Sequence, residues 1–169
     1  MTAKEVREVY RGHAIRVEVG TWPAGEREIV RHPGAVAVVA LVGGDRVVLV
    51  EQMRESLDRR IIEVPAGKRD VSGEPPEETA RRELKEETGY RLTSLRPLGR
   101  IHSSPGFSDE EVLLYIGDAV PDGPAEPDDD EGDIQVVLMP LADAIEAVRD
   151  GRITDGKSAV ALLLAASAR

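Results

Sequence analysis

Three glutamates gather on one short segment that the sequence predicts to be helical. Glu83, Glu86 and Glu87 fall within residues 77–88, a stretch that contains neither Gly nor Pro. Side chains three and four residues apart are neighbours on a helix, and each like-charged pair destabilises it by about 0.2–0.5 kcal/mol. Two interpretations account for this cost. Neighbouring arginines neutralise the glutamates on a solvated face, or the glutamates and the preceding loop hold a divalent cation, which prefers oxygen ligands.

The order of residues around this helix favours the cation. Gly67 is followed by Glu74, and seven residues later the chain reads R-E-L-K-E-E-T-G-Y, residues 82–90. This string resembles the Nudix box of the Nudix hydrolases, G-x5-E-x7-R-E-U-x-E-E-x-G-U. It departs from the pattern in two places: six residues separate Gly67 from Glu74, and Tyr90 is aromatic where an aliphatic residue is usual. Neither departure touches the carboxylates.

The resemblance implies an enzyme that hydrolyses a nucleoside diphosphate linked to another group, by attack of water at phosphorus with Mg²⁺ or Mn²⁺. A pyrophosphate is charged, so cations must neutralise it and activate the attacking water. Carried over by position, Glu83 and Glu87 are metal ligands, Glu86 is a ligand or near-ligand, and the backbone carbonyl of Ala66 is a further ligand. Arg82 is expected to pair with a box carboxylate and orient it, with an ordinary surface ion pair as the alternative.

Segments outside the box resemble the ADP-ribose pyrophosphatase branch of the family, namely V-P-A-G at 64–67, Q-M-R at 52–54 and S-P-G-F-S-D-E at 104–110. A proline sixteen residues beyond the box glycine marks that branch, and Pro105 stands at this distance from Gly89. The implied reaction splits ADP-ribose or a related ADP-sugar into AMP and a sugar phosphate. The alternatives are another substrate (a GDP-sugar, a flavin dinucleotide or a dinucleoside polyphosphate) or a non-catalytic module that binds nucleotide sugars. A binding module has no need of three acids in mutual repulsion.

The same resemblance suggests the residues that bind substrate. Arg54 would bind the pyrophosphate, because a guanidinium fork matches phosphate oxygens; a solvated charge at a strand end is the alternative. Pro105 belongs to the segment that marks the branch. Asp109 and Glu110 would accept hydrogen bonds from ribose hydroxyls, although a plain acidic loop explains them almost as well.

A second acidic segment, residues 122–133, holds seven acids and no base. As a charge run it predicts a solvated loop. The resemblance implies instead that one of its acids serves as general base, and Glu131 is the first choice, followed by Asp130 and Asp133. His102 has the chemistry of a base, but a lone His beside a loop is more often structural.

Hydrophobic periodicity predicts the elements that must position these residues. Continuous apolar runs predict buried strands, and breaker-free stretches ending at Gly predict helices. The predicted strands are 35–42, 47–50, 61–64, 112–116 and 134–139, the helices are 77–88, 141–150 and 157–168, and residues 65–76 form a loop. This order predicts an α/β (α+β) fold. The resemblance implies a Nudix-type α/β/α sandwich with a mixed sheet, preceded by an N-terminal antiparallel sheet.

Before Ala35 the apolar positions are sparse, and the clearest alternation is at Ile15, Val17 and Val19. Such a small sheet is marginal alone and must pack on something. The chain is therefore divided into N-terminal strands, 1–34, and a hydrolase domain, 35–169. The strands fold back on their own chain, or they form the intertwined homodimer that the resemblance implies. Trp22 is a candidate to contact the adenine or the partner, with ordinary packing equally plausible.

Composition excludes several classes of protein. The 169 residues include 22 Lys and Arg against 32 Asp and Glu, a net charge of −10, which disfavours nucleic-acid binding. The absence of Cys excludes thiolate zinc sites and Cys nucleophiles and favours the cytosol. No apolar run approaches the ~20 residues that cross a bilayer. We expect a soluble cytoplasmic protein without a membrane or nucleic-acid partner.

Overall fold

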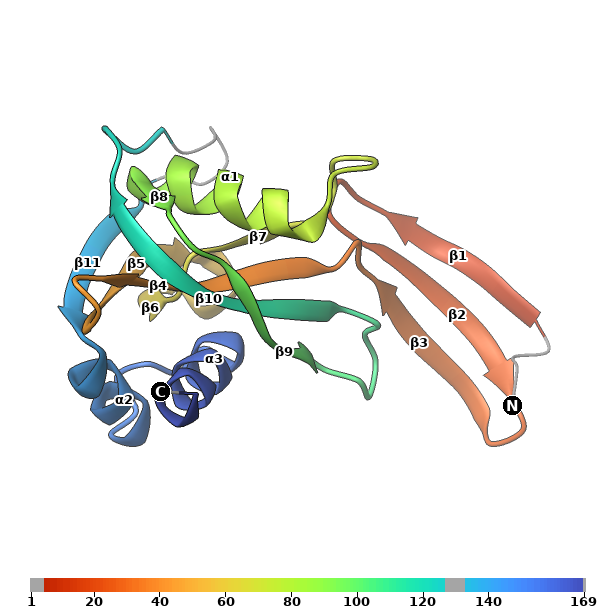
Figure 1. Ribbon diagram of the computed structural model, residues 1–169. Coiled ribbons are helices and arrows are strands. Elements are labelled where there is room, and N and C mark those ends of the chain that lie inside the picture. Colours follow the sequence, from red (N-terminus) through yellow and green to blue (C-terminus); the bar gives the residue numbers. More distant parts are fainter. Residues whose placement is uncertain (1–4, 127–132, 169) are drawn as a thin grey trace.

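The strand β4 (Ala35–Val42) lies in the middle of an eight-stranded sheet. The computed structural model describes residues 5–126 and 133–168 (Figure 1). β4 pairs in parallel with β10 (Glu111–Pro121) and antiparallel with β5 (Arg46–Arg54), which makes the sheet mixed. The main path runs β11-β5-β4-β10-β8, with β6, β7 and β9 paired to β5, β4 and β10. These remaining strands are β6 (Arg59–Glu63), β7 (Ala66–Lys68), β8 (Tyr90–Leu92), β9 (Arg96–His102) and β11 (Gln135–Pro140).

The two faces of β4 pack against different helices. Successive side chains of a strand point to opposite faces of the sheet. Ala37 and Val39 therefore pack in the core beneath α2 (Leu141–Arg149) and α3 (Gly156–Ser167), whereas Val36 and Val38 pack with α1 (Pro76–Thr88). Figure 1 shows α1 on one side of the sheet and α2 and α3 on the other. The predicted α/β/α sandwich with a mixed sheet is confirmed.

Three strands were not predicted from the sequence. β7 lies inside the segment 65–76 that was predicted to be a loop, and β8 and β9 follow α1 where no strand was expected. β9 contains Pro97 and Gly99, which are typical strand breakers, but its Pro97 stands opposite Tyr115 next to a register irregularity. Proline is tolerated at such bulges because a ladder hydrogen bond is already missing there.

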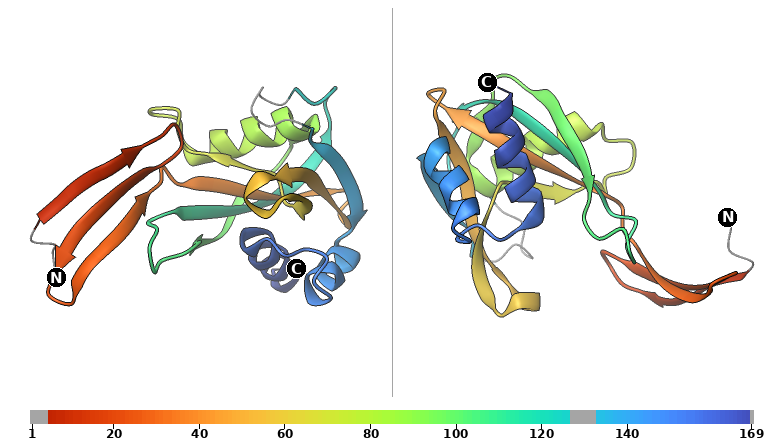
Figure 2. Two further views of the ribbon diagram at one scale, coloured as in Figure 1. Left: turned by 180° about the vertical axis from the view of Figure 1, so that it is seen from behind. Right: turned by 90° about the horizontal axis from the view of Figure 1, so that it is seen from below.

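The N-terminal residues form a separate three-stranded antiparallel sheet of β1 (Glu5–Arg11), β2 (Arg16–Trp22) and β3 (Gly25–Arg31). This sheet projects from the body, as Figure 2 shows from two further directions. It is joined to the body at β3, where the Val30 amide donates to the Phe107 carbonyl at 2.7 Å and the Asp109 amide donates to the Val30 carbonyl at 3.2 Å. The division into 1–34 and 35–169, and the dimer, stay predictions.

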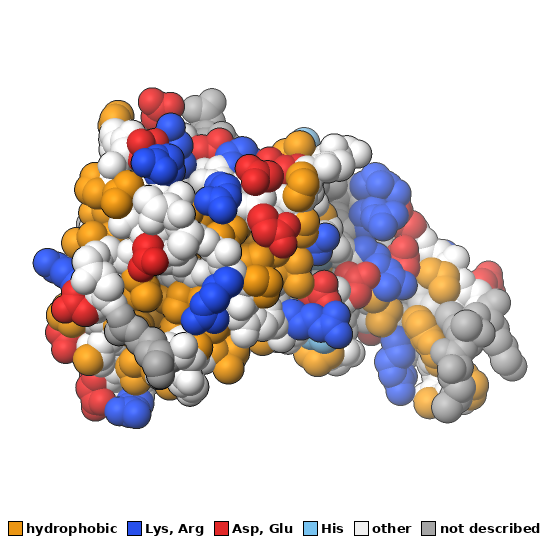
Figure 3. Space-filling view, viewed as in Figure 1, with side chains coloured by type: hydrophobic (Ala, Val, Ile, Leu, Met, Phe, Trp, Pro, Cys, Tyr) orange, Lys and Arg blue, Asp and Glu red, His pale blue; other side chains and the backbone are white. Residues whose placement is uncertain are grey.

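Charged side chains of both signs are interspersed over the body, and Arg side chains are visible on the N-terminal sheet next to it (Figure 3). Within residues 5–126 and 133–168, no helix combines the length and the apolar character needed to span a membrane.

Candidate active site

A cleft of about 1170 Å³ runs along the edge of α1 and reaches the first turn of α3. The sequence-predicted residues that line it are Arg54, Ala66, Arg82, Glu83, Glu87, Glu110 and Asp133. Three further candidates, Glu86, Pro105 and Asp109, are outside this lining. Glu131, the first choice for general base, and Asp130 lie outside the described residues. The structure thus gathers most of the predicted metal-binding and phosphate-binding side chains around one cavity.

The helix α1 begins at Pro76 and ends at Thr88, with Gly89 as its C-terminal cap, as the sequence predicts to within a residue. Proline suits the first turn of a helix, where its missing N–H costs no hydrogen bond. Gly89 adopts a left-handed φ of 71°, and its amide donates to the Lys85 carbonyl at 2.8 Å. A Cβ at Gly89 would stand 2.4 Å from the Gly123 carbonyl oxygen, so both conformation and space require glycine. The end of α1 is therefore packed directly against the start of the acidic segment.

The acidic segment is fixed to the body at Glu126 and at Asp133. The Glu126 amide donates to the Glu86 carbonyl at 2.8 Å. At Asp133, the Arg60 guanidinium donates to the carboxylate at 3.1 Å and to the backbone carbonyl at 2.8 Å. Residues 127–132, which lie between these anchors, are not described.

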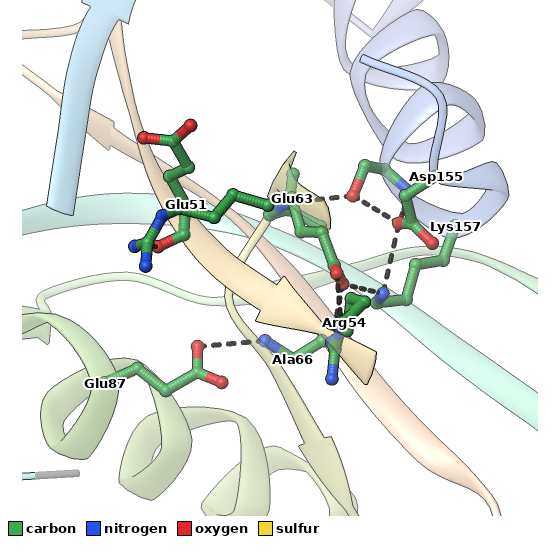
Figure 4. Close-up of polar contacts among 10 residues, drawn as sticks. Glu51, Arg54, Glu63, Ala66, Glu87, Asp155 and Lys157 are labelled. Carbon is green, nitrogen blue, oxygen red and sulfur yellow. Dashed lines mark hydrogen bonds and ion pairs between the residues drawn. The ribbon is translucent and has the colours of Figure 1, made fainter. Parts of the chain in front are cut away.

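Two of the box glutamates are buried where α1 meets β7. The exposed fractions of Glu83 and Glu87 are 7% and 2%. The Glu87 carboxylate accepts a hydrogen bond from the Ala66 amide at 3.2 Å (Figure 4). The Glu83 carboxylate lies so close to Gly67 that a Cβ there would stand 1.9 Å from the Glu83 Cδ. The first glycine of the box is thus required by the close approach of this carboxylate to the backbone.

Arg82 joins the remaining box acids. Its guanidinium lies 2.9 Å from Glu83, 2.8 Å from Glu86 and 3.2 Å from Glu74. Burial lowers the pKa of Arg82, but its hydrogen bond to Glu74 and the charges of Glu83 and Glu86 outweigh burial and raise it above the ordinary value. The Thr79 hydroxyl also donates to Glu74, at 2.8 Å. Glu74 therefore reaches Arg82 despite the extra residue in the preceding loop.

These contacts bear on both interpretations of the acidic helix, because Arg82 pairs with Glu83 and Glu86 as the arginine interpretation expects. A solvated face would leave the glutamates in water, but Glu83 and Glu87 are buried. Among the described residues, no three His, Cys, Asp or Glu side chains already form a cation-binding group. The donor set nevertheless fits Mg²⁺ or Mn²⁺: two buried carboxylates face the cleft beside the side-chain-free backbone of Gly67, and hard cations prefer such oxygen ligands.

Arg54 belongs to a buried ionic network that the sequence did not predict. Its Nε and Nη2 donate to the two carboxylate oxygens of Glu63 at 2.6 and 2.8 Å (Figure 4). Glu63 is only 1% exposed and is also contacted by the Lys157 ammonium, which lies 3.1 Å from Asp155. Burial raises the pKa of Glu63, but the hydrogen bond from Arg54 and the charge of Lys157 outweigh it and hold the pKa below its ordinary value. An acid inside the apolar run I-I-E-V was the one available signal.

The loop that carries Pro105 is tied to the N-terminal sheet. The Asp109 carboxylate accepts hydrogen bonds from Arg31 at 3.0 Å and from the His32 amide at 2.9 Å. Burial raises the pKa of Asp109, whereas these two hydrogen bonds lower it to below the ordinary value. Glu110 lines the cleft, with its carboxylate 3.6 Å from His32 Nδ1. The structure thus separates the two acids: Asp109 fixes the loop, and Glu110 faces the cleft.

Known proteins resemble this chain over most of its length. A model of the NUDIX domain matches residues 31–160. An ADP-ribose pyrophosphatase of Bacillus subtilis (strain 168) is 42% identical over 148 residues, which are 86% of this chain and 79% of that protein. A methanol dehydrogenase activator of Bacillus methanolicus is 38% identical over 165 residues, 94% of this chain and 88% of that protein. The solved structure of an ADP compounds hydrolase has a TM-score of 0.81 at 24% identity, covers 98% of this chain and 92% of that chain, and shows the same fold.

Proposed function

The chain belongs to the NUDIX family and is a pyrophosphohydrolase, and from this premise we propose that it hydrolyses the pyrophosphate bond of ADP-ribose or a related ADP-sugar in the presence of Mg²⁺ or Mn²⁺. The products are AMP and a sugar phosphate. The observation that carries this proposal is the composition of the cleft, which has buried carboxylates of α1 on one wall and the Arg54 guanidinium on another. A pyrophosphate complements both walls, because its oxygens bind a cation on one side and a guanidinium on the other.

We propose that Arg54 binds the substrate through Nη1, the guanidinium nitrogen that does not contact Glu63. Nε and Nη2 are engaged by Glu63, and Nη1 is the guanidinium nitrogen that this bidentate contact does not use. In our proposal Nη1 donates to a pyrophosphate oxygen and stabilises the charge that develops on the leaving phosphate. The hydrogen bond to Glu63 and the charges of nearby carboxylates outweigh burial and raise the pKa of Arg54 above its ordinary value, so its guanidinium is charged when the anion binds.

The box residues would hold the cation. Glu83, Glu87 and the Ala66 carbonyl are the proposed ligands, with Glu86 a ligand or near-ligand held by Arg82. When bound, Mg²⁺ or Mn²⁺ supplies a Lewis acid that neutralises the pyrophosphate and lowers the pKa of the attacking water. Arg82 keeps Glu83 and Glu86 oriented through its ion pairs, and Glu110 faces the cleft as an acceptor for ribose hydroxyls.

A panel of substrates tests this function. AMP or other nucleotide release is measured from ADP-ribose, ADP-glucose, GDP-mannose, flavin adenine dinucleotide and a dinucleoside polyphosphate, each with Mg²⁺ and with Mn²⁺. We expect the highest kcat/KM with ADP-ribose, and AMP and ribose 5-phosphate as products. A higher kcat/KM with a GDP-sugar or a dinucleotide would assign the enzyme to that substrate class instead.

We predict that Glu131→Gln lowers kcat by about 10²–10⁴-fold with little change in KM, because a general base acts mainly in the transition state. Asp133 is the weaker choice, since Arg60 already engages its carboxylate at 3.1 Å. The measurement is steady-state kinetics of Glu131→Gln beside Asp130→Asn and Asp133→Asn. A large loss in either Asn variant instead would show that the choice of Glu131 is wrong, and no loss in any of the three would leave the segment a solvated loop.

A further inference from the structure

Lys157 is an unusual residue for its position in the helix. It is the second residue of α3 (Gly156–Ser167), two positions after Asp155, the residue that caps the helix. The N-terminus of a helix carries partial positive charge and disfavours a cation. Here the Lys157 side chain is only 18% exposed, and its ammonium is held between Glu63 and Asp155. Capping does not require it, because the Asp155 carboxylate already accepts from the Ser158 amide at 2.9 Å.

Glu63 connects Lys157 to the wall of the cleft. Its Oε1 accepts from Arg54 Nε, and its Oε2 accepts from both Arg54 Nη2 and the Lys157 ammonium. With Lys157 in place, the orientation of the buried carboxylate is fixed from the α3 side independently of Arg54. This matters because the Arg54 side chain is 39% exposed and the bidentate contact to Glu63 is what aims its guanidinium. Figure 4 shows the three side chains converging from β5, β6 and α3.

We propose that Lys157 is a positioning residue, which acts through Glu63 to hold Arg54 with Nη1 toward the substrate. The inference rests on the proposed function, in which Arg54 binds the pyrophosphate. Lys157 also lines the cleft. The rival role is therefore direct contact of its ammonium with substrate, and this role predicts an effect that does not depend on Glu63.

A double-mutant cycle separates the two roles. Misplacing a binding group by about 1 Å can cost ~10²-fold, so we expect Lys157→Met and Glu63→Gln each to lower kcat/KM by about 10–100-fold. The kcat/KM of the double variant should be no lower than that of the less active single variant. Once Glu63 is neutral, Lys157 no longer has a carboxylate through which it can position Arg54. Lys157→Arg should recover most of the loss. Effects that multiply in the double variant would show that Lys157 acts on its own and would overturn the proposal.

A measurement without substrate tests whether Lys157 positions Arg54 even if the proposed function is wrong. The Arg54 Nε–H signal in a ¹⁵N NMR spectrum, assigned by its loss in Arg54→Lys, reports the hydrogen bond to Glu63 through its exchange with water. We expect slow exchange in wild type and Lys157→Arg, and faster exchange in Lys157→Met. Arg149→Met, which removes an exposed ion pair with Glu146 on α2, is the control and should exchange like wild type.

The outcomes are distinguishable. Unchanged Nε–H exchange in Lys157→Met overturns the positioning role, whatever the substrate is. A wild-type enzyme that does not hydrolyse ADP-ribose contradicts the proposed function, but the exchange measurement still decides the role of Lys157, and the cycle is then run on the best substrate of the panel. If Lys157→Met does not fold, Lys157→Gln takes its place, and the same faster exchange is expected because a neutral amide holds the Glu63 carboxylate less strongly than an ammonium does.

Discussion

Replacing Glu87 by Gln should lower kcat with Mg²⁺ by about 10²-fold or more, since a bound cation contributes several kcal/mol of transition-state stabilisation. The fold should survive. Glu87 accepts from the Ala66 amide at 3.2 Å, and a glutamine oxygen can accept the same hydrogen bond. The substitution also removes one charge from a cluster of acids, which relieves like-charge repulsion on α1. The measurement is kcat together with the thermal midpoint.

The matched control is Glu78→Gln, the same substitution on the same helix. The Glu78 side chain is 62% exposed, pairs with Arg81 at 3.8 Å and does not line the cleft. Its kcat should equal that of wild type, and surface pairs of this kind stabilise a protein by at most about 1 kcal/mol. Near wild-type turnover in Glu87→Gln would refute the assignment of Glu87 as a metal ligand. A large drop in its thermal midpoint would show that the residue is mainly structural.

The parts of the fold that could be predicted are those that local pattern determines. The apolar run of β4 and the breaker-free stretch of α1 specify their own secondary structure. β8 and β9 do not: β8 is three residues long, β9 contains Pro97 and Gly99, and both are strands because β10 offers them a partner. The prediction for β10 was short for the same reason, since its residues 119–121 pair with β8. Tertiary pairing, which no local pattern encodes, determines these elements.

The candidate site divides in the same way. Glu83 and Glu87 could be predicted because their spacing and that of the surrounding box lie on one helix. The role of Lys157 in the network around Arg54 could not, since Glu63 and Lys157 are 94 residues apart and only the packing of α3 against the sheet brings them together. Asp109 is the opposite case. Its residue type suggested a ribose contact, but the structure engages it with Arg31, 78 residues away.

Deleting residues 1–34 should abolish both dimerisation and activity. The N-terminal sheet exposes apolar side chains that a monomer leaves in water: Val6, Val9 and Tyr10 of β1 are 49%, 45% and 56% exposed. At the end of β2, Trp22 lies over Gly20 and lines an apolar hollow with Ile29. A three-stranded sheet with so little buried surface gains stability when a second copy covers it, and an isologous contact would close a two-fold dimer.

The truncated chain should fold, because both hydrophobic clusters of the body consist of residues from Ala35 onward. Light scattering at micromolar concentration should give the full chain a mass of twice the 18.3 kDa of one protomer. The truncated chain should give the mass of one truncated protomer. The double substitution Val9→Ser and Tyr10→Ser is a milder change. It keeps all three strands and should weaken only the association of the two protomers. A full chain of 18.3 kDa would refute the dimer. A truncated monomer that still hydrolyses ADP-ribose would show that one chain builds the whole site, and that the N-terminal sheet contributes only to assembly.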